Sequence, residues 1–185
     1  GLMLHACQPQ NSTENVSVRE SSPKPAVERG SLRSYEFTDS ILGSRRVDVW
    51  IPEGLQEGDS VAWVWMHDGQ MLYDSTVTWN KQEWLVDETL QGLIDENRVV
   101  PTVVIGLYNS ENRRRELFPQ KPLEAAFPED VEGILGGKPL ADAYLSFATT
   151  QVIPEVLASL PYRMRASGWV AGSSMGGLMS AYALC

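Results

Sequence analysis

Histidine, cysteine and long apolar runs are all scarce in this chain of 185 residues. No apolar run approaches the roughly 18 residues that a membrane-spanning helix needs. No cluster of cysteine and histidine has the spacing of metal ligands, so we predict no metal site and no cofactor. The two cysteines, Cys7 and Cys185, lie near opposite ends of the chain, which is not the pattern of a disulfide framework.

Basic residues are also in the minority. Lysine and arginine total 15 against 24 aspartates and glutamates, which gives a formal net charge of -9. The phosphates of nucleic acid would be repelled by this charge, so we expect no nucleic-acid partner. The hydrophobic fraction of 43% is ordinary for a globular protein, and the length fits one domain with a tail.

The first residues differ from the rest. Residues 8–25 are rich in Gln, Asn, Ser, Glu and Pro, which is typical of a flexible linker. Residues 4–7, Leu-His-Ala-Cys, resemble the end of a bacterial lipoprotein signal, in which the cysteine becomes the lipidated residue. We therefore predict a signal remnant and linker over 1–31, an exported protein that is periplasmic or membrane-anchored, and a lipid on Cys7. The alternative is a disordered leader with an incidental cysteine.

Residues 32–185 are predicted to form an α/β domain. The continuous apolar runs at 61–66 and 102–107 are typical of strands buried on both faces, and a helix over 83–97 is predicted between them. A strand, a helix and a buried strand imply a parallel sheet flanked by helices. Asn80 is the predicted N-cap of this helix, with Glu83 completing a capping box. The sequence further predicts strands over 32–38, 45–51 and 167–171, helices over 141–151 and 178–184, and an irregular segment over 110–138.

Residues 172–176, Gly-Ser-Ser-Met-Gly, match the Gly-x-Ser-x-Gly pattern of a nucleophile elbow. A predicted strand precedes the pattern and a predicted helix follows it, as an elbow requires. Ser174 is therefore the candidate nucleophile, and the alternative is an ordinary Gly/Ser turn. A serine hydroxyl needs a general base, usually histidine, yet the two histidines, His5 and His67, both precede the pattern.

A second polar segment, His-Asp-Gly-Gln at residues 67–70, follows the predicted strand 61–66 directly. Ligands of open parallel sheets bind at the carboxyl ends of the strands. An acyl-transfer site needs two N–H donors for its oxyanion, and Met175, the residue after the candidate nucleophile, can supply one. The turn at 67–70 can present the other. His67 is better interpreted as a hydrogen-bonded structural residue than as the base.

Residues 66–74, Met-His-Asp-Gly-Gln-Met-Leu-Tyr-Asp, together with Gly-Ser-Ser-Met-Gly-Gly at 172–177, resemble the signature of the putative esterase family of α/β-hydrolases, akin to esterase D and enterochelin esterase. The resemblance spans 32–184. It implies an α/β-hydrolase fold, Ser174 as acyl-accepting nucleophile, and an oxyanion hole formed by the backbone N–H groups of Gln70 and Met175. It also implies an Asp or Glu and then a His, and neither occurs in the eleven residues after Ser174. We therefore expect a C-terminally truncated hydrolase domain that is inactive alone, with strand 167–171 as an exposed edge.

The resemblance implies a carboxylic ester hydrolase that acts on a small-molecule or carbohydrate ester, such as a sugar, feruloyl or siderophore ester. An acyltransferase of the same fold and a non-catalytic binding protein are the alternatives. Arg113, the first of three consecutive arginines, is a candidate substrate contact. The other interpretation of these arginines is a solvated run, or an ion pair with Glu111 or Glu116. Three tryptophans within predicted strands are expected in the core: Trp63, Trp65 and Trp169.

Overall fold

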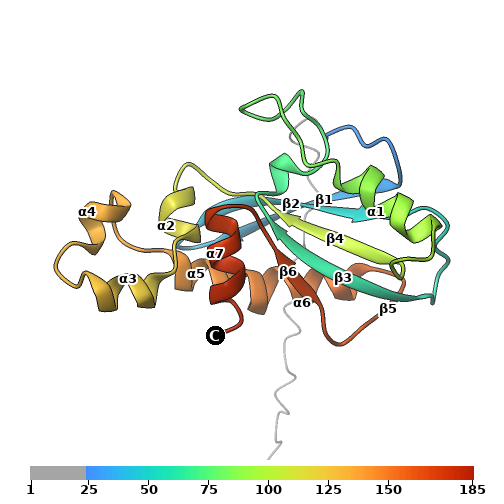
Figure 1. The fold of residues 1–185 in the computed structure, drawn as a ribbon. Coiled ribbons are helices and arrows are strands. Elements are labelled where there is room, and N and C mark those ends of the chain that lie inside the picture. The colour runs from blue at the N-terminus through green and yellow to red at the C-terminus, as the bar shows by residue number, and fades with distance from the viewer. Residues whose placement is uncertain (1–23) are drawn as a thin grey trace, which may run out of the picture.

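The computed structural model describes residues 24–185, so Cys7 and its predicted lipid lie outside the described residues. One twisted sheet carries helices on both faces (Figure 1). The strands are β1 (Ser31–Asp39), β2 (Gly43–Ile51), β3 (Ser60–His67), β4 (Thr102–Leu107), β5 (Arg163–Met164) and β6 (Trp169–Ala171). The helices are η1 (Gly69–Met71), α1 (Val86–Asp95), α2 (Arg113–Leu117), α3 (Gln120–Ala126), α4 (Val131–Leu135), α5 (Ala141–Phe147), η2 (Ala148–Val152), α6 (Ile153–Ser159) and α7 (Met175–Tyr182).

The sheet is mixed, with its parallel part around β3. Its order is β1-β2-β4-β3-β5, and β6 also pairs with β3. The pairs β1/β2 and β2/β4 are antiparallel, whereas β3 runs parallel to β4, β5 and β6. The carboxyl ends of β3, β4 and β6 therefore meet at one edge of the sheet, where ligands bind in folds of this kind. The prediction of an α/β fold with a mostly parallel sheet flanked by helices is confirmed, and β1 and β2 join this sheet as an antiparallel hairpin.

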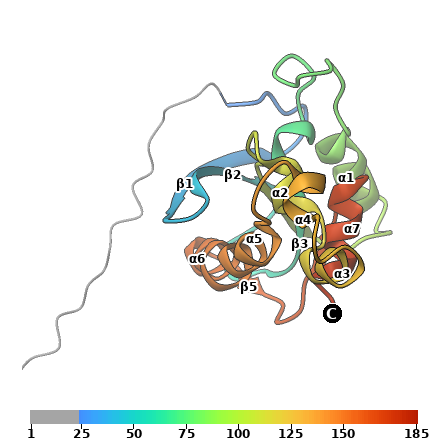
Figure 2. The ribbon, with the colours of Figure 1, turned by 90° about the vertical axis from the view of Figure 1, so that its left-hand side faces the viewer.

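Apolar side chains on both faces of the sheet explain the continuous apolar runs. In β4, Val103 and Ile105 belong to the core that includes α5, η2 and α6, whereas Val104 belongs to the core that includes α1. Figure 2 shows α5 and α6 together on one side of the sheet and α1 on the other. Each face of a central strand is covered, so alternate residues have no reason to be polar.

Helix α1 begins later than predicted, and its predicted cap is wrong. The helix starts at Val86, and its N-cap is Leu85, in a left-handed conformation (φ 50°) without a side-chain cap. Asn80 Oδ1 accepts a hydrogen bond from the Gln82 N–H at 3.1 Å instead. Asparagine closes short turns with the same chemistry that caps helices, so its position in the sequence did not distinguish the two.

The predicted helix over 141–151 continues to Ser159 through a change of pitch. Between α5 and α6, residues 148–152 form a π-helical turn, and Pro154 occupies the first turn of α6. Proline has no N–H to donate to the preceding turn, so the regular helical pattern cannot pass through it unchanged. The prediction that Pro154 would kink or restart the helix is confirmed.

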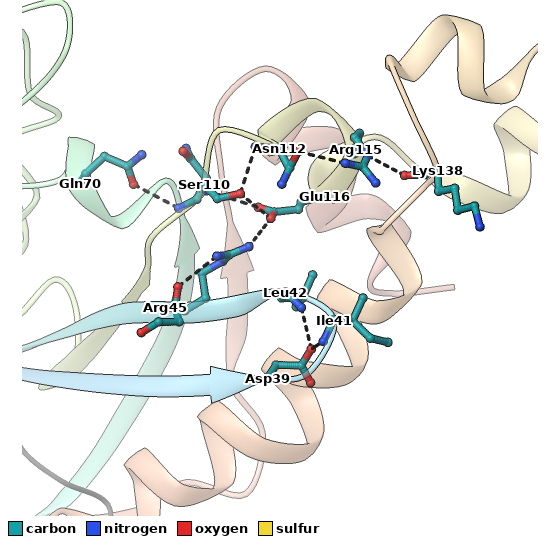
Figure 3. Close-up of polar contacts among 12 residues, drawn as sticks. Asp39, Ile41, Leu42, Arg45, Gln70, Ser110, Asn112, Arg115, Glu116 and Lys138 are labelled. Atoms are coloured by element: carbon teal, nitrogen blue, oxygen red, sulfur yellow. Dashed lines mark hydrogen bonds and ion pairs between the residues drawn. The ribbon is translucent and has the colours of Figure 1, made fainter.

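The segment predicted to be irregular, 110–138, contains three short helices, and a buried ion pair joins the first of them, α2, to the sheet. Arg45 of β2 donates to Glu116 of α2, and the Glu116 side chain is fully buried. The Ser110 hydroxyl donates to the same carboxylate at 2.6 Å (Figure 3). Glu116 therefore pairs with the sheet and not with the neighbouring arginines, which are the partners that the sequence suggested.

The predicted linker over 1–31 extends too far. Pro25 is buried, and Val27 packs against the core beside α1. The Trp50 indole donates to the Arg29 carbonyl at 2.7 Å. Every residue has a backbone carbonyl that a distant side chain can bind, whatever its own side chain is. The composition of this segment therefore gave no sign that it packs on the domain.

Trp65 is buried as expected, but the prediction for Trp169 is wrong, because Trp169 is 55% exposed. Within residues 24–185, β3 is the sole strand that pairs with β6, so the outer side of β6 is uncovered. No helix in the described part of the chain is long and apolar enough to cross a membrane.

Replacing Glu116 with leucine should lower the free energy of unfolding by about 3–5 kcal/mol, because Arg45 would keep a buried charge without its partner. Urea denaturation of the two proteins measures this difference. The matched control is Glu96→Leu, which breaks the exposed Glu96–Arg98 pair and should leave stability nearly unchanged. Equal losses in both variants would contradict the importance of the buried pair.

Candidate active site

The segment between β6 and α7 is a sharp turn with Ser174 at its tip. β6 ends at Ala171 and α7 starts at Met175. Ser174 has φ 56° and ψ -120°, a conformation that residues with a side chain rarely adopt. Such strain is characteristic of nucleophile elbows, in which it holds the serine hydroxyl away from the backbone. Ser174 is exposed to solvent.

Close packing explains both glycines of the Gly-x-Ser-x-Gly pattern. A Cβ atom on Gly172 would lie 2.6 Å from the carbonyl carbon of Gly176, which is closer than real side chains allow. A Cβ atom on Gly176 would lie 3.3 Å from the Cβ of His67. The first turn of α7 therefore rests on the end of β3, and the glycines let helix and strand approach.

A cleft of about 450 Å³ lies beside the elbow. Its lining comes from the segments that follow β3, β4 and β6, which is where the sheet topology places a ligand site. Trp79, from the loop before α1, is 84% exposed at this cleft. The cleft is lined by Asp68, Gln70, Met71, Trp79, Asn80, Trp84, Asn109, Ser110, Arg113, Ser173 and Ser174.

Two backbone N–H groups near the elbow have no acceptor within residues 24–185: those of Gln70 and Met175. Gln70 lies in η1, a turn that follows Asp68 in a left-handed conformation (φ 58°). Met175 is the first residue of α7, where the leading N–H groups have no partner inside the helix. Unpaired donors of this kind are what an oxyanion hole requires, and this role for the two residues stays a prediction.

Arg113 is held by a residue that sequence reasoning missed. Its guanidinium donates to Asp68 through Nε at 2.6 Å and Nη2 at 2.8 Å. Asp68 is only 2% exposed, and the Asn109 side-chain amide also donates to it. The hydrogen bond with Asp68 raises the pKa of Arg113. The partner suggested by the sequence, Glu111 or Glu116, is therefore wrong, while substrate contact by Arg113 stays a prediction.

Of the other two arginines, Arg114 is solvated as one interpretation predicted, whereas Arg115 makes structural hydrogen bonds that the sequence did not suggest. Arg114 is exposed to solvent. Arg115 donates to the Lys138 carbonyl at 2.7 Å and to the Asn112 side chain at 3.0 Å (Figure 3). The sequence did place Asp68 near the site, because it belongs to the Asp-Gly-Gln segment. It did not show which of the three consecutive arginines would bind the Asp68 carboxylate.

His67 is a buried structural residue. Its ring is fully enclosed, and its Nδ1 lies 2.9 Å from the Tyr144 hydroxyl. Burial lowers the pKa of His67 to about 4, so the ring is neutral at pH 7. A general base must reach the proton it removes, and His67 is covered by the first turn of α7. No group of histidine, cysteine, aspartate or glutamate in the described residues has the arrangement of a metal site.

Comparison with known proteins agrees with this geometry. Residues 38–185 match the model of the esterase family described as "Putative esterase", and the chain belongs to this family. A search of curated proteins found no match.

Solved structures of similar fold include three hydrolases. An IroE-like serine hydrolase from Shewanella oneidensis is 20% identical, with a TM-score of 0.59 over 83% of this chain and 46% of that chain. The siderophore hydrolase EstA from Aspergillus nidulans is 22% identical, with a TM-score of 0.60 over 90% of this chain and 56% of that chain. The enterobactin esterase FES from Shigella flexneri is 21% identical, with a TM-score of 0.56 over 86% of this chain and 34% of that chain. These likenesses show an α/β-hydrolase type of fold, and the chain spans between about a third and just over half of each of these proteins.

The elbow predicts a position-specific cost for added side chains. Gly172→Ala should lower the free energy of unfolding by about 1–3 kcal/mol, because its methyl group meets the backbone of α7. Gly92→Ala is the matched control: it lies inside α1 with no atom within 4 Å of the added Cβ, and it should raise stability by about 0.5–1 kcal/mol. Urea denaturation measures both, and a neutral Gly172→Ala would show that the turn can relax.

The buried His67 predicts a pH dependence of stability. Its pKa is about 4 in the folded protein and about 6.5 when unfolded, so the unfolded chain binds more protons between these values. The resulting stability is complete above pH 6.5 and falls by about 3 kcal/mol as the pH drops to 4. The unfolding free energy of the native protein minus that of His67→Gln should decrease over this range. Parallel curves for the two proteins would contradict it.

Proposed function

We propose that this chain forms the nucleophile-bearing part of a serine carboxylic ester hydrolase, and that Ser174 becomes acylated during the reaction. The observation that carries the proposal is the strained, exposed Ser174 at the tip of the turn, beside a cleft at the carboxyl edge of the sheet. Membership in an esterase family supports the same reaction class. In the proposed reaction the cleft holds the ester, and the unpaired N–H groups of Gln70 and Met175 bind the oxyanion.

In the proposed reaction, Ser174 Oγ attacks the carbonyl carbon of the ester while a general base accepts its proton. The N–H groups of Gln70 and Met175 donate to the negatively charged oxygen of the tetrahedral intermediate. Collapse of the intermediate breaks the bond to the alcohol, which leaves with the proton, and an acyl-serine remains. Water then attacks the acyl group, the carboxylic acid is released, and the Ser174 hydroxyl is restored.

The base is assigned to a residue outside the described part of the chain. His67 is the one histidine among residues 24–185, and it is buried and neutral. The reaction therefore needs groups that the 162 described residues do not supply in a usable position, and the test below uses the full-length gene product.

The proposed substrate is a small-molecule or carbohydrate ester. The similar structures include proteins named as siderophore hydrolases and an enterobactin esterase, which favours siderophore esters among the candidates. The net charge of -9 argues against a nucleic-acid partner. Export and a lipid anchor at Cys7 are part of the same proposal, supported by the Leu-His-Ala-Cys segment.

Replacing the nucleophile tests the proposal directly. In the full-length protein, Ser174→Ala should reduce hydrolysis of p-nitrophenyl acetate by about 10⁴-fold and abolish labelling by a fluorophosphonate probe. Ser173→Ala is the matched control, because Ser173 lines the same cleft without a strained backbone, and it should keep both. Activity that survives Ser174→Ala would refute the assignment. Faster turnover with an added sugar, with a new sugar ester as product, would favour the acyltransferase alternative.

A further inference from the structure

One wall of the cleft is a loop that joins η1 to α1. It spans residues 73–85 and contributes Trp79, Asn80 and Trp84 to the lining. We call it the cleft loop. In Figure 1 it is the green segment that rises above the sheet, and the blue N-terminal segment runs close to its base.

Inside the cleft loop, backbone-to-backbone hydrogen bonds are few, and most internal hydrogen bonds come from side chains, such as the Lys81 ammonium to the Thr76 carbonyl at 3.0 Å. The Val77 N–H donates to the Asp74 carbonyl at 3.3 Å and the Lys81 N–H to the Thr78 carbonyl at 3.4 Å, both long for hydrogen bonds. Lys81 and Leu85 have positive φ angles, which are costly for residues with side chains. At its far end the loop is bonded to the segment around η1, because the Trp84 N–H donates to the Met71 carbonyl at 3.0 Å and the Val86 N–H to the Leu72 carbonyl at 3.1 Å.

Residues 26–29, which we call the N-terminal strap, contact both ends of the loop from outside it. The Ala26 N–H donates to the carboxylate of Asp74, at the start of the cleft loop, at 2.8 Å. The Glu28 N–H donates to the carboxylate of Asp87, just beyond the end of the loop, at 2.8 Å, and the Arg29 N–H does so at 3.3 Å. The strap therefore bridges the two ends of the cleft loop.

Asp87 offers the firmer of the two contacts. It is only 1% exposed, so water cannot replace the strap's N–H groups as its hydrogen-bond donors without entering the core. Asp74 is more open and also accepts from the Thr76 N–H at 2.9 Å and hydroxyl at 2.6 Å, which connects the strap to the first turn of the loop.

The strap is itself fixed to the body of the protein. The Arg29 guanidinium donates to Glu53 through Nε at 3.0 Å and Nη2 at 2.8 Å, and its Nη2 also lies 3.0 Å from Asp95 at the end of α1. The Trp50 indole of β2 donates to the Arg29 carbonyl. The strap thus connects β2 and α1 with the two carboxylates that flank the cleft loop.

We propose that the N-terminal strap is a positioning element for substrate: by binding Asp74 and Asp87 it fixes both ends of the cleft loop and so places Trp79, Asn80 and Trp84 beside Ser174. Its effect on substrate binding rests on the proposed function, whereas its hold on the loop does not. Asp74 and Asp87 act through the loop and do not themselves line the cleft.

Hydrogen exchange tests the hold on the loop without requiring activity. Asp87→Leu removes both acceptor oxygens, and Ala26→Pro removes one strap donor. Each should accelerate amide exchange in residues 74–85 by roughly tenfold, with β3 and β4 unchanged. The matched controls are Asp87→Asn, which keeps an acceptor oxygen, and Ala26→Gly, which keeps the strap N–H at an exposed position. Both controls should exchange like the native protein.

Unchanged exchange in Asp87→Leu and Ala26→Pro would overturn the proposal. Acceleration spread evenly over β3 and β4 would also overturn it, because the effect would then be a general loss of stability. In the full-length protein, the same two variants should raise KM for a bulky aryl ester about tenfold while kcat for p-nitrophenyl acetate stays within about threefold. If Ser174→Ala retained activity, the proposed function would fail while the exchange result still decided the role of the strap.

Discussion

The candidate site depends on the buried carboxylate of Asp68. This residue directly follows β3 in a left-handed conformation, accepts two hydrogen bonds from Arg113 and one from Asn109, and lies close to Gly176 at the start of α7. A buried charge is tolerated only when its oxygens are fully paired. The carboxylate therefore joins the turn that carries Gln70 to the segment after β4, and it lies beside the first turn of α7.

This arrangement leaves the cleft with few polar groups that are free to bind substrate. The Asn109 amide is bonded to Asp68, the Ser110 hydroxyl to Glu116, and two of the Arg113 donors to Asp68. The other side chains that line the cleft include the exposed Trp79, the exposed hydroxyls of Ser173 and Ser174, and the amides of Gln70 and Asn80.

Much of the fold could be predicted from the sequence because its signals are local. Continuous apolar runs marked β3 and β4, and the Gly-x-Ser-x-Gly pattern marked the turn at Ser174. The failures were long-range or ambiguous. Nothing local could pair Arg113 with Asp68 or Arg45 with Glu116, since each cation had several candidate partners. The docking of residues 25–30 uses backbone groups that composition does not reveal, and Asn80 closes a turn with the chemistry expected of a helix cap.

The position of β3 in the sheet has a consequence for how the chain folds. β1 and β2 form a hairpin from neighbouring residues, but β3 receives its partners β4, β5 and β6 only from segments much later in the chain. Contacts between distant residues form slowly, because the intervening chain must first be ordered. During synthesis on the ribosome, this largely apolar strand would therefore emerge well before its partners. It would be exposed to association with other chains over that interval, and chaperones that shield such segments would have their main task there.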